Sequence, residues 1–245
     1  MIELVPTPEI VPDAYVARLD LEKIFGRAAP LQVDLGCGDG SFLCELAQKY
    51  PEKNFLGIER LTGRVEKACR KARPSRTGGK IDIGAGGSRA TTTGKPARVD
   101  EPGGESINMR VLQSETSYAV RYLLPERSVE TFYLLFPDPW PKRRHHRRRI
   151  VTLEFLDAIY HALEPGGILR IATDHLDYFR QIERVACDAA KERALDLDCL
   201  KQSSCPRFIV DPNDVDLPPT KFERRFRAQG APIYRLSLGK VSPVM

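Results

Sequence analysis

The chain has 245 residues, a formal net charge of +5 and a hydrophobic fraction of 42%. This length and composition fit one α/β domain and exclude a disordered or fibrous chain. Its six cysteines form no CxxC pair and no spacing typical of zinc, and no apolar run approaches the length of a membrane span or follows a cationic start. We therefore expect a cytoplasmic protein with reduced thiols, no metal and no membrane attachment. A monomer is the favoured form, and an oligomer stays open as the alternative.

After a proline-punctuated arm over residues 1–30, expected to pack loosely, the first regular pattern is a βαβ unit. The spacing predicts strands over 31–35 and 54–58 and helices over 41–50 and 64–73. The turn Gly36-Cys37-Gly38-Asp39-Gly40 joins the first strand to the first helix, and Glu59 closes the second strand. A glycine-rich turn with an acid about 20 residues later places a nucleotide ribose beside a carboxylate. The unit therefore predicts a nucleotide-containing ligand.

Residues 74–105 are rich in Gly, Thr, Ser, Arg and Pro and nearly free of aliphatic side chains. Such a segment cannot bury enough apolar area to offset the cost of ordering, so we expect a flexible insertion. A segment that contacts RNA is the less favoured alternative. A strand is predicted next, over 108–112, and Glu115 follows near its carboxyl end.

The residues from Thr131 to Phe136 are apolar or aromatic apart from one threonine, and they predict a buried parallel strand. Prolines 137, 139 and 141 then stiffen a loop that carries Asp138 and the single tryptophan, Trp140. Six Lys or Arg residues follow within positions 142–149. Taken alone, Asp138 could be an ordinary turn residue, and the basic run could be a solvated face. Together they place a carboxylate beside an anion-attracting surface at the ligand-binding edge of the sheet.

The remaining chain predicts helices over 150–163 and 178–193 and a strand over 168–172 that ends near Asp174. Residues 164–167, Glu-Pro-Gly-Gly, read as a helix stop and turn. Prolines 218 and 219 precede a basic segment from Thr220 to Arg227, which by itself also reads as the start of an exposed helix. The alternation over 233–238 predicts a strand at the sheet edge.

The segments Phe136–Lys142 with its basic continuation, and Thr220–Arg224, resemble the signature motifs of the bacterial tRNA (guanine-N7-)-methyltransferase family. The resemblance extends from about Gln32 to Leu238, interrupted by 74–105. The acid two residues before the first glycine, Asp34, is similar to the cofactor motif of class I S-adenosylmethionine-dependent methyltransferases. The resemblance implies a Rossmann-like, doubly wound, mostly parallel α/β sheet with helices on both faces, and S-adenosyl-L-methionine as cofactor.

The resemblance also implies residue roles. Cofactor contacts are expected at Asp34, Gly36, Gly38, Gly40, Glu59, Glu115 and Asp138, although Glu115 stands where the family carries a shorter Asp. Asp138 is the expected catalytic residue, which positions the base. Substrate contacts are expected at Lys142, Asp174, Thr220, Lys221, Phe222 and Glu223, with 220–223 as a loop beside Asp174 and Lys142. RNA backbone contacts are expected at Arg143, Arg144, Arg147, Arg148, Arg149 and Arg224.

The implied substrate is tRNA, and the implied target is N7 of guanine 46 in the variable loop. Two alternatives stay open. A class I methyltransferase acting on another substrate would have no use for so long a cationic rim. An RNA-binding protein of this fold without catalysis would differ by failing to bind the cofactor.

Overall fold

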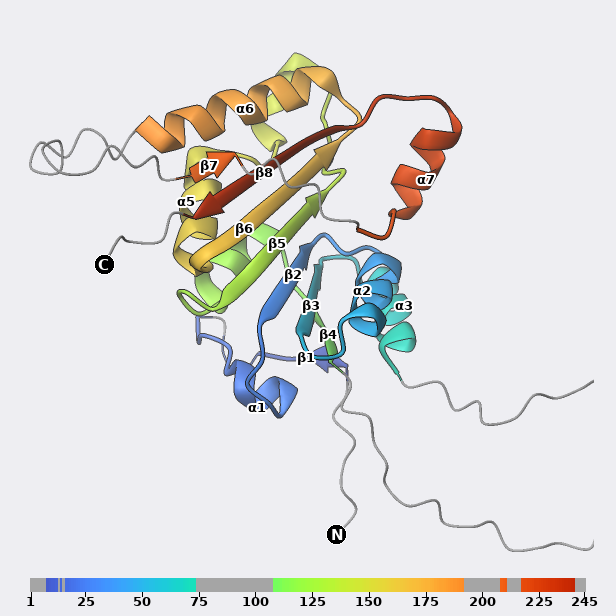
Figure 1. Ribbon diagram of the computed structural model, residues 1–245, viewed down its shortest axis with the longest axis vertical. Helices are drawn as coiled ribbons and strands as arrows, with labels where there is room; N and C mark the ends of the chain where they lie inside the picture. Colours follow the sequence, from blue (N-terminus) through green and yellow to red (C-terminus); the bar gives the residue numbers. More distant parts are fainter. Residues whose placement is uncertain are drawn as a thin grey trace, which may run out of the picture.

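The computed structural model describes residues 8–12, 14, 16–73, 108–191, 208–210 and 217–240. Within these residues the strands form one eight-stranded sheet in the order β1-β4-β3-β2-β5-β6-β8-β7 (Figure 1). The strands are β1 Glu9–Ile10, β2 Leu31–Leu35, β3 Asn54–Glu59, β4 Met109–Gln113, β5 Val129–Leu135, β6 Leu163–Thr173, β7 Phe208–Val210 and β8 Tyr234–Lys240.

The sheet is doubly wound. The pairs among β1 to β6 are parallel, whereas β8 runs antiparallel to both β6 and β7. From the central β2 the chain continues through β3 and β4 on one side and returns to β5 and β6 on the other. The direction of winding therefore reverses between β2 and β5, the place where open α/β sheets bind ligands.

Helices cover both faces of the sheet (Figure 1). The cluster on one face includes side chains from α1, α5 and α6, and the cluster on the other includes side chains from α2 and α3. The helices are α1 Leu21–Phe25, α2 Ser41–Lys49, α3 Thr62–Ala72, α4 Thr116–Tyr118, a π-helical turn Ala119–Leu123, a 3-10 helix Arg143–Arg148, α5 Leu153–Ala162, α6 Leu176–Lys191 and α7 Lys221–Ala228.

Alternation along the strands builds the two cores. In β3, Leu56 and Ile58 join the cluster beneath α5 and α6, whereas Phe55 joins the cluster beneath α2 and α3. Successive side chains of a strand point to opposite faces, so a strand covered on both sides must be apolar at nearly every position. Both β2 and β3 are buried along their whole length, although β2 also carries two buried polar residues, Gln32 and Asp34.

Gly40 is required where α2 begins. Its φ is +71°, and a Cβ atom there would lie 2.8 Å from the Cβ of Ala68 in α3. Gly40 is itself buried, so it serves the close approach of α2 and α3 rather than the surface of a cleft. Gly40 does not line the cleft described below, and its expected cofactor contact stays a prediction.

The predicted doubly wound sheet is confirmed, and the strands and helices predicted from residue 31 to 73 lie within about one turn of their observed ends. The expected turn over 164–167 is an irregularity inside β6, where the pairing shifts between Val129 and Thr131 of β5. The arm was expected to pack loosely, but β1 pairs with β4, and Leu19 and Phe25 are buried in the core. The expected insertion over 74–105 lies outside the described residues.

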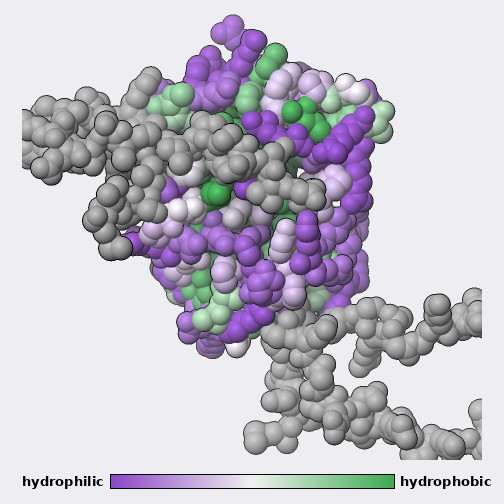
Figure 2. Space-filling view, viewed as in Figure 1, coloured by the Kyte–Doolittle hydropathy of each residue, from purple (hydrophilic) through white to green (hydrophobic). Residues whose placement is uncertain are grey.

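Where Figure 2 colours this face by hydropathy, the surface is largely hydrophilic, and the apolar patches are small and separated by polar side chains. Among the helices that the structure describes, none is long and apolar enough to cross a membrane. In the same part of the chain, no group of three His, Cys, Asp or Glu side chains is arranged to hold a metal ion.

Candidate active site

A cleft of about 670 Å³ opens at the carboxyl ends of β2 and β5, the point where the winding reverses. It is lined by the glycine turn on one side, by the proline loop after β5 on another, and by the start of α7. The predicted site residues that line it are Asp34, Gly36, Gly38, Glu59, Glu115, Asp138, Arg147, Arg148, Arg149, Thr220, Lys221 and Phe222. The fold thus brings the expected cofactor turn and the expected catalytic carboxylate to one cleft.

The glycine turn is held against the end of β3 by its backbone. The N–H groups of Gly36 and Cys37 both donate to the carbonyl of Ile58, at 2.8 and 3.0 Å. Gly36 has a φ of +81°, a conformation that glycine adopts without strain. The turn and the Glu59 region therefore form one unit.

Glu59 is a fixed acceptor on the cleft wall. Its carboxylate is buried and accepts hydrogen bonds from the backbone N–H groups of Arg60 and Leu61, each at 2.9 Å, and of Gly38 at 3.2 Å. A carboxylate has about four lone-pair sites, so it retains capacity for a further donor such as a ribose hydroxyl.

Asp34 is the most perturbed acid of the cleft. Burial raises its pKa to about 7, and the nearby charge of Glu59 adds to this effect. No hydrogen-bond donor from the described residues reaches its carboxylate. Asp34 and Glu59 are both buried acids, which makes the cleft favourable for a positively charged ligand, and a strongly perturbed group such as Asp34 is typical of functional sites.

The proline loop adopts a strained conformation that presents Asp138. Phe136 and Trp140 have positive φ values of 54° and 43°, which are unusual for aromatic residues. The loop is tied down because the N–H of Phe136 donates to the carbonyl of Ala172 at 2.7 Å. Asp138, between the two strained residues, is exposed to the cleft. Strain of this kind persists where the surroundings fix it, often at functional sites.

Arg149 differs from its expected role as an RNA backbone contact. Its side chain is only 1% exposed and donates to the carbonyl of Pro139 at 2.8 Å and to Gln181 at 2.6 Å. It also pairs with Asp177 at 2.8 Å. Its guanidinium therefore anchors the proline loop to α6.

The rest of the basic run forms a cationic rim. Lys142, Arg143, Arg144, Arg147 and Arg148 are exposed, and the last two line the cleft. Arg148 lies over the ring of Trp140, 4.9 Å from its centroid, and His145 contacts the same ring edge to face at 5.9 Å. Asp174 follows β6 at the same edge of the sheet, although neither it nor Lys142 lines the cleft.

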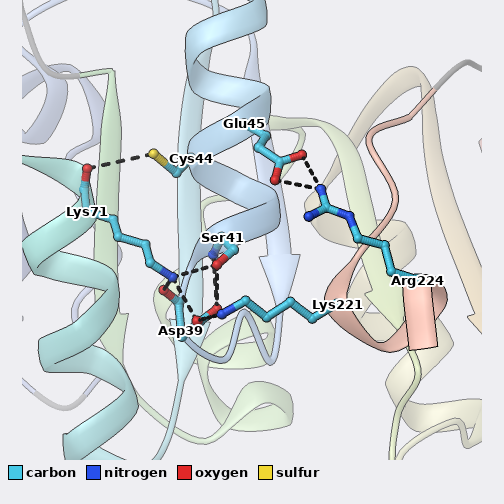
Figure 3. Close-up of polar contacts among 7 residues, drawn as sticks. All are labelled: Asp39, Ser41, Cys44, Glu45, Lys71, Lys221 and Arg224. Atoms are coloured by element: carbon cyan, nitrogen blue, oxygen red, sulfur yellow. Dashed lines mark hydrogen bonds and ion pairs between the residues drawn. The ribbon is translucent and has the colours of Figure 1, made fainter.

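The segment 220–223 begins α7, so the expectation of a loop is wrong for the structure. The Thr220 hydroxyl accepts from the N–H of Glu223 at 3.0 Å and caps the helix. Lys221 pairs with Asp39 of the glycine turn, and Arg224 pairs with Glu45 of α2 at 2.9 Å (Figure 3). Glu223 is buried and pairs with Arg227 and with Arg235 of β8.

Asp39, which carried no assigned role, is the hub of this contact (Figure 3). Burial opposes its ionisation, but hydrogen bonds from Lys221, Lys71 and Ser41 outweigh burial and hold its pKa well below the usual range. Two lysines from α3 and α7 thus meet on one carboxylate. In the sequence, the only sign of this role was the presence of an acid inside the glycine turn. The lysines that pair with Asp39 could not be identified, because they come close only in the folded chain.

Among the residues that line the cleft without having been predicted are Arg64, Thr116 and Ser117. They lie in the first turns of the helices that follow β3 and β4. Glu115 also lines the cleft, and its carboxylate accepts from the N–H of Tyr118 at 2.8 Å, which caps α4. Arg64, Thr116 and Ser117 follow shortly after parallel strands, and this position in the sequence could have indicated that they line the cleft.

Known proteins that resemble this chain are methyltransferases. The methyltransferase family Methyltransf_4, described as "Putative methyltransferase", matches residues 28–236. The tRNA (guanine-N(7)-)-methyltransferase of Halorhodospira halophila is 36% identical over 220 residues, 89% of this chain and 78% of that protein. The protein of the same name from Idiomarina loihiensis is 32% identical over 89% of this chain and 74% of its own length.

Among solved structures, one described as an antibiotic-related methyltransferase covers 96% of this chain and 98% of its own, with a TM-score of 0.56 and 14% identity. This likeness shows the fold alone. The family match and the two relatives go further, and on them the chain belongs to the tRNA (guanine-N7-)-methyltransferase family.

Proposed function

We propose that this protein transfers a methyl group from S-adenosyl-L-methionine to N7 of guanine 46 in the variable loop of tRNA. The observation that carries the proposal is the single cleft that Asp138 shares with the glycine turn and Glu59. Membership of the family supports the reaction and the substrate class. The choice of position 46 rests on the motif resemblance.

The acids of the cleft fit the cofactor. When bound, S-adenosyl-L-methionine supplies an electrophilic methyl group on a positively charged sulfur, and it also carries an ammonium group and a ribose. Asp34, which no described donor reaches, suits a cationic group, and Glu59 suits the ribose hydroxyls. We assign these two contacts and backbone contacts to Gly36 and Gly38.

The reaction requires alignment rather than proton transfer. Guanine N7 carries a free lone pair, so it forms the new bond to carbon while the sulfur–carbon bond breaks and its electron pair stays on sulfur. The positive charge moves from sulfur to the base. Orientation of two reactants can supply about 7–11 kcal/mol of the barrier. Asp138 would orient the base by accepting from N1–H or the exocyclic amine, and its charge would stabilise the methylated, cationic product.

The target must leave its helix or lie in a loop, because the major groove of A-form RNA is closed to side chains. The exposed arginines at 143, 144, 147 and 148 would hold the RNA backbone, with Lys142 and Asp174 at the rim and Thr220 and Lys221 at the cleft wall. Arg224 and Glu223 already have protein partners and would act by holding α7 in place.

The experiment combines unmodified tRNA with labelled cofactor and locates 7-methylguanosine by borohydride reduction and aniline cleavage. We expect cleavage at position 46, and no cleavage in a transcript that carries adenine there. Asp138→Asn should reduce turnover on the order of a hundredfold, as loss of one preorganised polar group does. Asp157→Asn, in α5 and outside the lining of the cleft, is the matched control. Wild-type turnover in the Asp138 variant would contradict its role, and methylation at another guanine would contradict the position.

A further inference from the structure

Three phenylalanines meet at the mouth of the cleft. The ring of Phe222 lies 6.3 Å from Phe136 and 6.5 Å from Phe226, and the rings of Phe136 and Phe226 lie 5.4 Å apart. The planes of Phe222 and Phe226 differ by only 24°. Phe222 is nevertheless 53% exposed and lines the cleft together with Phe136 and Asp138.

Phe222 differs from its neighbours in the segment 220–223. Thr220 caps the helix, Lys221 is paired with Asp39, and Glu223 is buried with its two arginines. These three side chains hold the helix in place. The aromatic side chain is the one among the four that presents a large apolar surface to the cleft.

The position of Phe222 is fixed relative to the glycine turn. On either side of it in sequence, Lys221 and Arg224 attach α7 to Asp39 of the glycine turn and to Glu45 of α2 (Figure 3). Figure 1 shows α7 beyond the carboxyl ends of the central strands, across from α2. An exposed aromatic ring that is backed by two others and held on an anchored helix is preorganised for a flat ligand.

We propose that the ring of Phe222, supported by Phe136 and Phe226, is the platform on which the extruded guanine stacks while Asp138 reads its edge. This proposal deepens the function proposed above and rests on it. A base that leaves its stack loses its neighbours, and an aromatic side chain replaces them. Methylation at N7 makes the base cationic, and a cation over an aromatic face is attracted more strongly than a neutral ring. The platform therefore favours the methylated state as well as the bound base.

The test compares Phe222→Leu, which keeps apolar volume but removes the aromatic face, with Phe222→Tyr, which keeps that face. We expect Phe222→Leu to lower kcat/KM for tRNA by roughly 5- to 150-fold, the factor that corresponds to one base–aromatic stack. Phe222→Tyr should stay within about threefold of the wild type on the same scale. Cofactor affinity and the salt dependence of RNA binding should be unchanged in both variants. Val16→Ala changes an exposed apolar residue of the N-terminal arm that does not line the cleft, and it is the control.

A second readout does not depend on methyl transfer. In RNA that carries 2-aminopurine at the target position, stacking on Phe222 should quench the base in complexes with the wild type and with Phe222→Tyr. The complex with Phe222→Leu should be brighter. If the wild type methylates guanine and Phe222→Leu matches it in both readouts, the platform is refuted and the proposed function stands. If quenching depends on Phe222 but no methylguanosine forms, the platform stands and the function fails. Absence of both signals in the wild type overturns both.

Discussion

Lys221 at the start of α7 forms an ion pair with Asp39 in the glycine turn, although 182 residues separate them in the chain. The same carboxylate accepts a hydrogen bond from Ser41 and pairs with Lys71. One acid therefore ties the beginning of α2 to α3 and to the helix that carries Phe222. This contact makes the shape of the cleft depend on the C-terminal part of the chain.

A double-mutant cycle should detect this contact. Asp39→Asn, Lys221→Met and the double variant should give a coupling free energy of about 0.2–1 kcal/mol for urea unfolding, because Lys221 is largely exposed to water. The coupling should shrink at high salt, since ions screen such pairs. Asp39→Asn should cost more than Lys221→Met, because Asp39 has three partners. Arg225→Met, on an exposed position of the same helix, should show no coupling with Asp39.

The stability of the cofactor-free protein should depend on the state of Asp34. Its pKa is about 7 in the fold, raised from 3.8. A raised carboxylate pKa means that the folded state holds a proton that the unfolded state has released, so stability is lost as pH rises from about 4 to about 7. Asp34→Asn should remove this loss. Relative to the wild type, its free energy of unfolding should therefore be higher at pH 8 than at pH 5 by on the order of a few kcal/mol.

Urea unfolding at pH 5 and pH 8 measures how Asp34 changes the free energy of unfolding. The exposed Glu52→Gln variant is the control and should keep the pH dependence of the wild type. The explanation fails if Asp34→Asn loses stability between pH 5 and pH 8 as steeply as the wild type. The same variant should bind the cofactor more weakly, because it lacks the negative charge.

Gly40 and Gly63 should respond in opposite ways to substitution by alanine. Gly40→Ala places a methyl group 2.8 Å from Ala68 at a φ of +71°, and overpacking with left-handed strain should cost about 2–4 kcal/mol. Gly63→Ala meets nothing within 4 Å and lies in α3, so it should be neutral or stabilising by up to about 1 kcal/mol. Midpoints of urea unfolding measure both. Equal effects would contradict the close approach of α2 and α3.

Substitutions of Arg149 and Arg144 should affect different properties: the first should lower stability, and the second should weaken RNA binding. Arg149→Met leaves the Pro139 carbonyl without its donor and should lower the free energy of unfolding by about 1–3 kcal/mol. Arg144→Gln should leave stability unchanged and should reduce the slope of log K against log salt for tRNA by about 0.7–0.9. Titrations at several salt concentrations, beside thermal unfolding, measure the two quantities. A tRNA affinity flat in salt would contradict the cationic rim.

Much of the architecture follows from local patterns. The apolar run of β5, the apolar positions of β2 and β3, the glycine turn and the prolines after Phe136 identify a doubly wound sheet with its ligand edge. They succeed because a strand covered on both faces has to be apolar at nearly every position, and because glycine and proline have few conformational roles. The motifs around Asp138 and Thr220 indicated the family, and the comparisons confirmed it.

The sequence by itself therefore determined the sheet, the cleft edge and the family. Only the tertiary structure decided that Arg149 is an internal anchor, that Asp39 joins three segments, and that α7 presents Phe222 to the cleft. The physical reason is that the sequence shows only the identity of a charged residue. It does not show whether that residue contacts solvent, RNA or a carboxylate 182 positions away. Burial and partner identity arise only when the whole chain has packed.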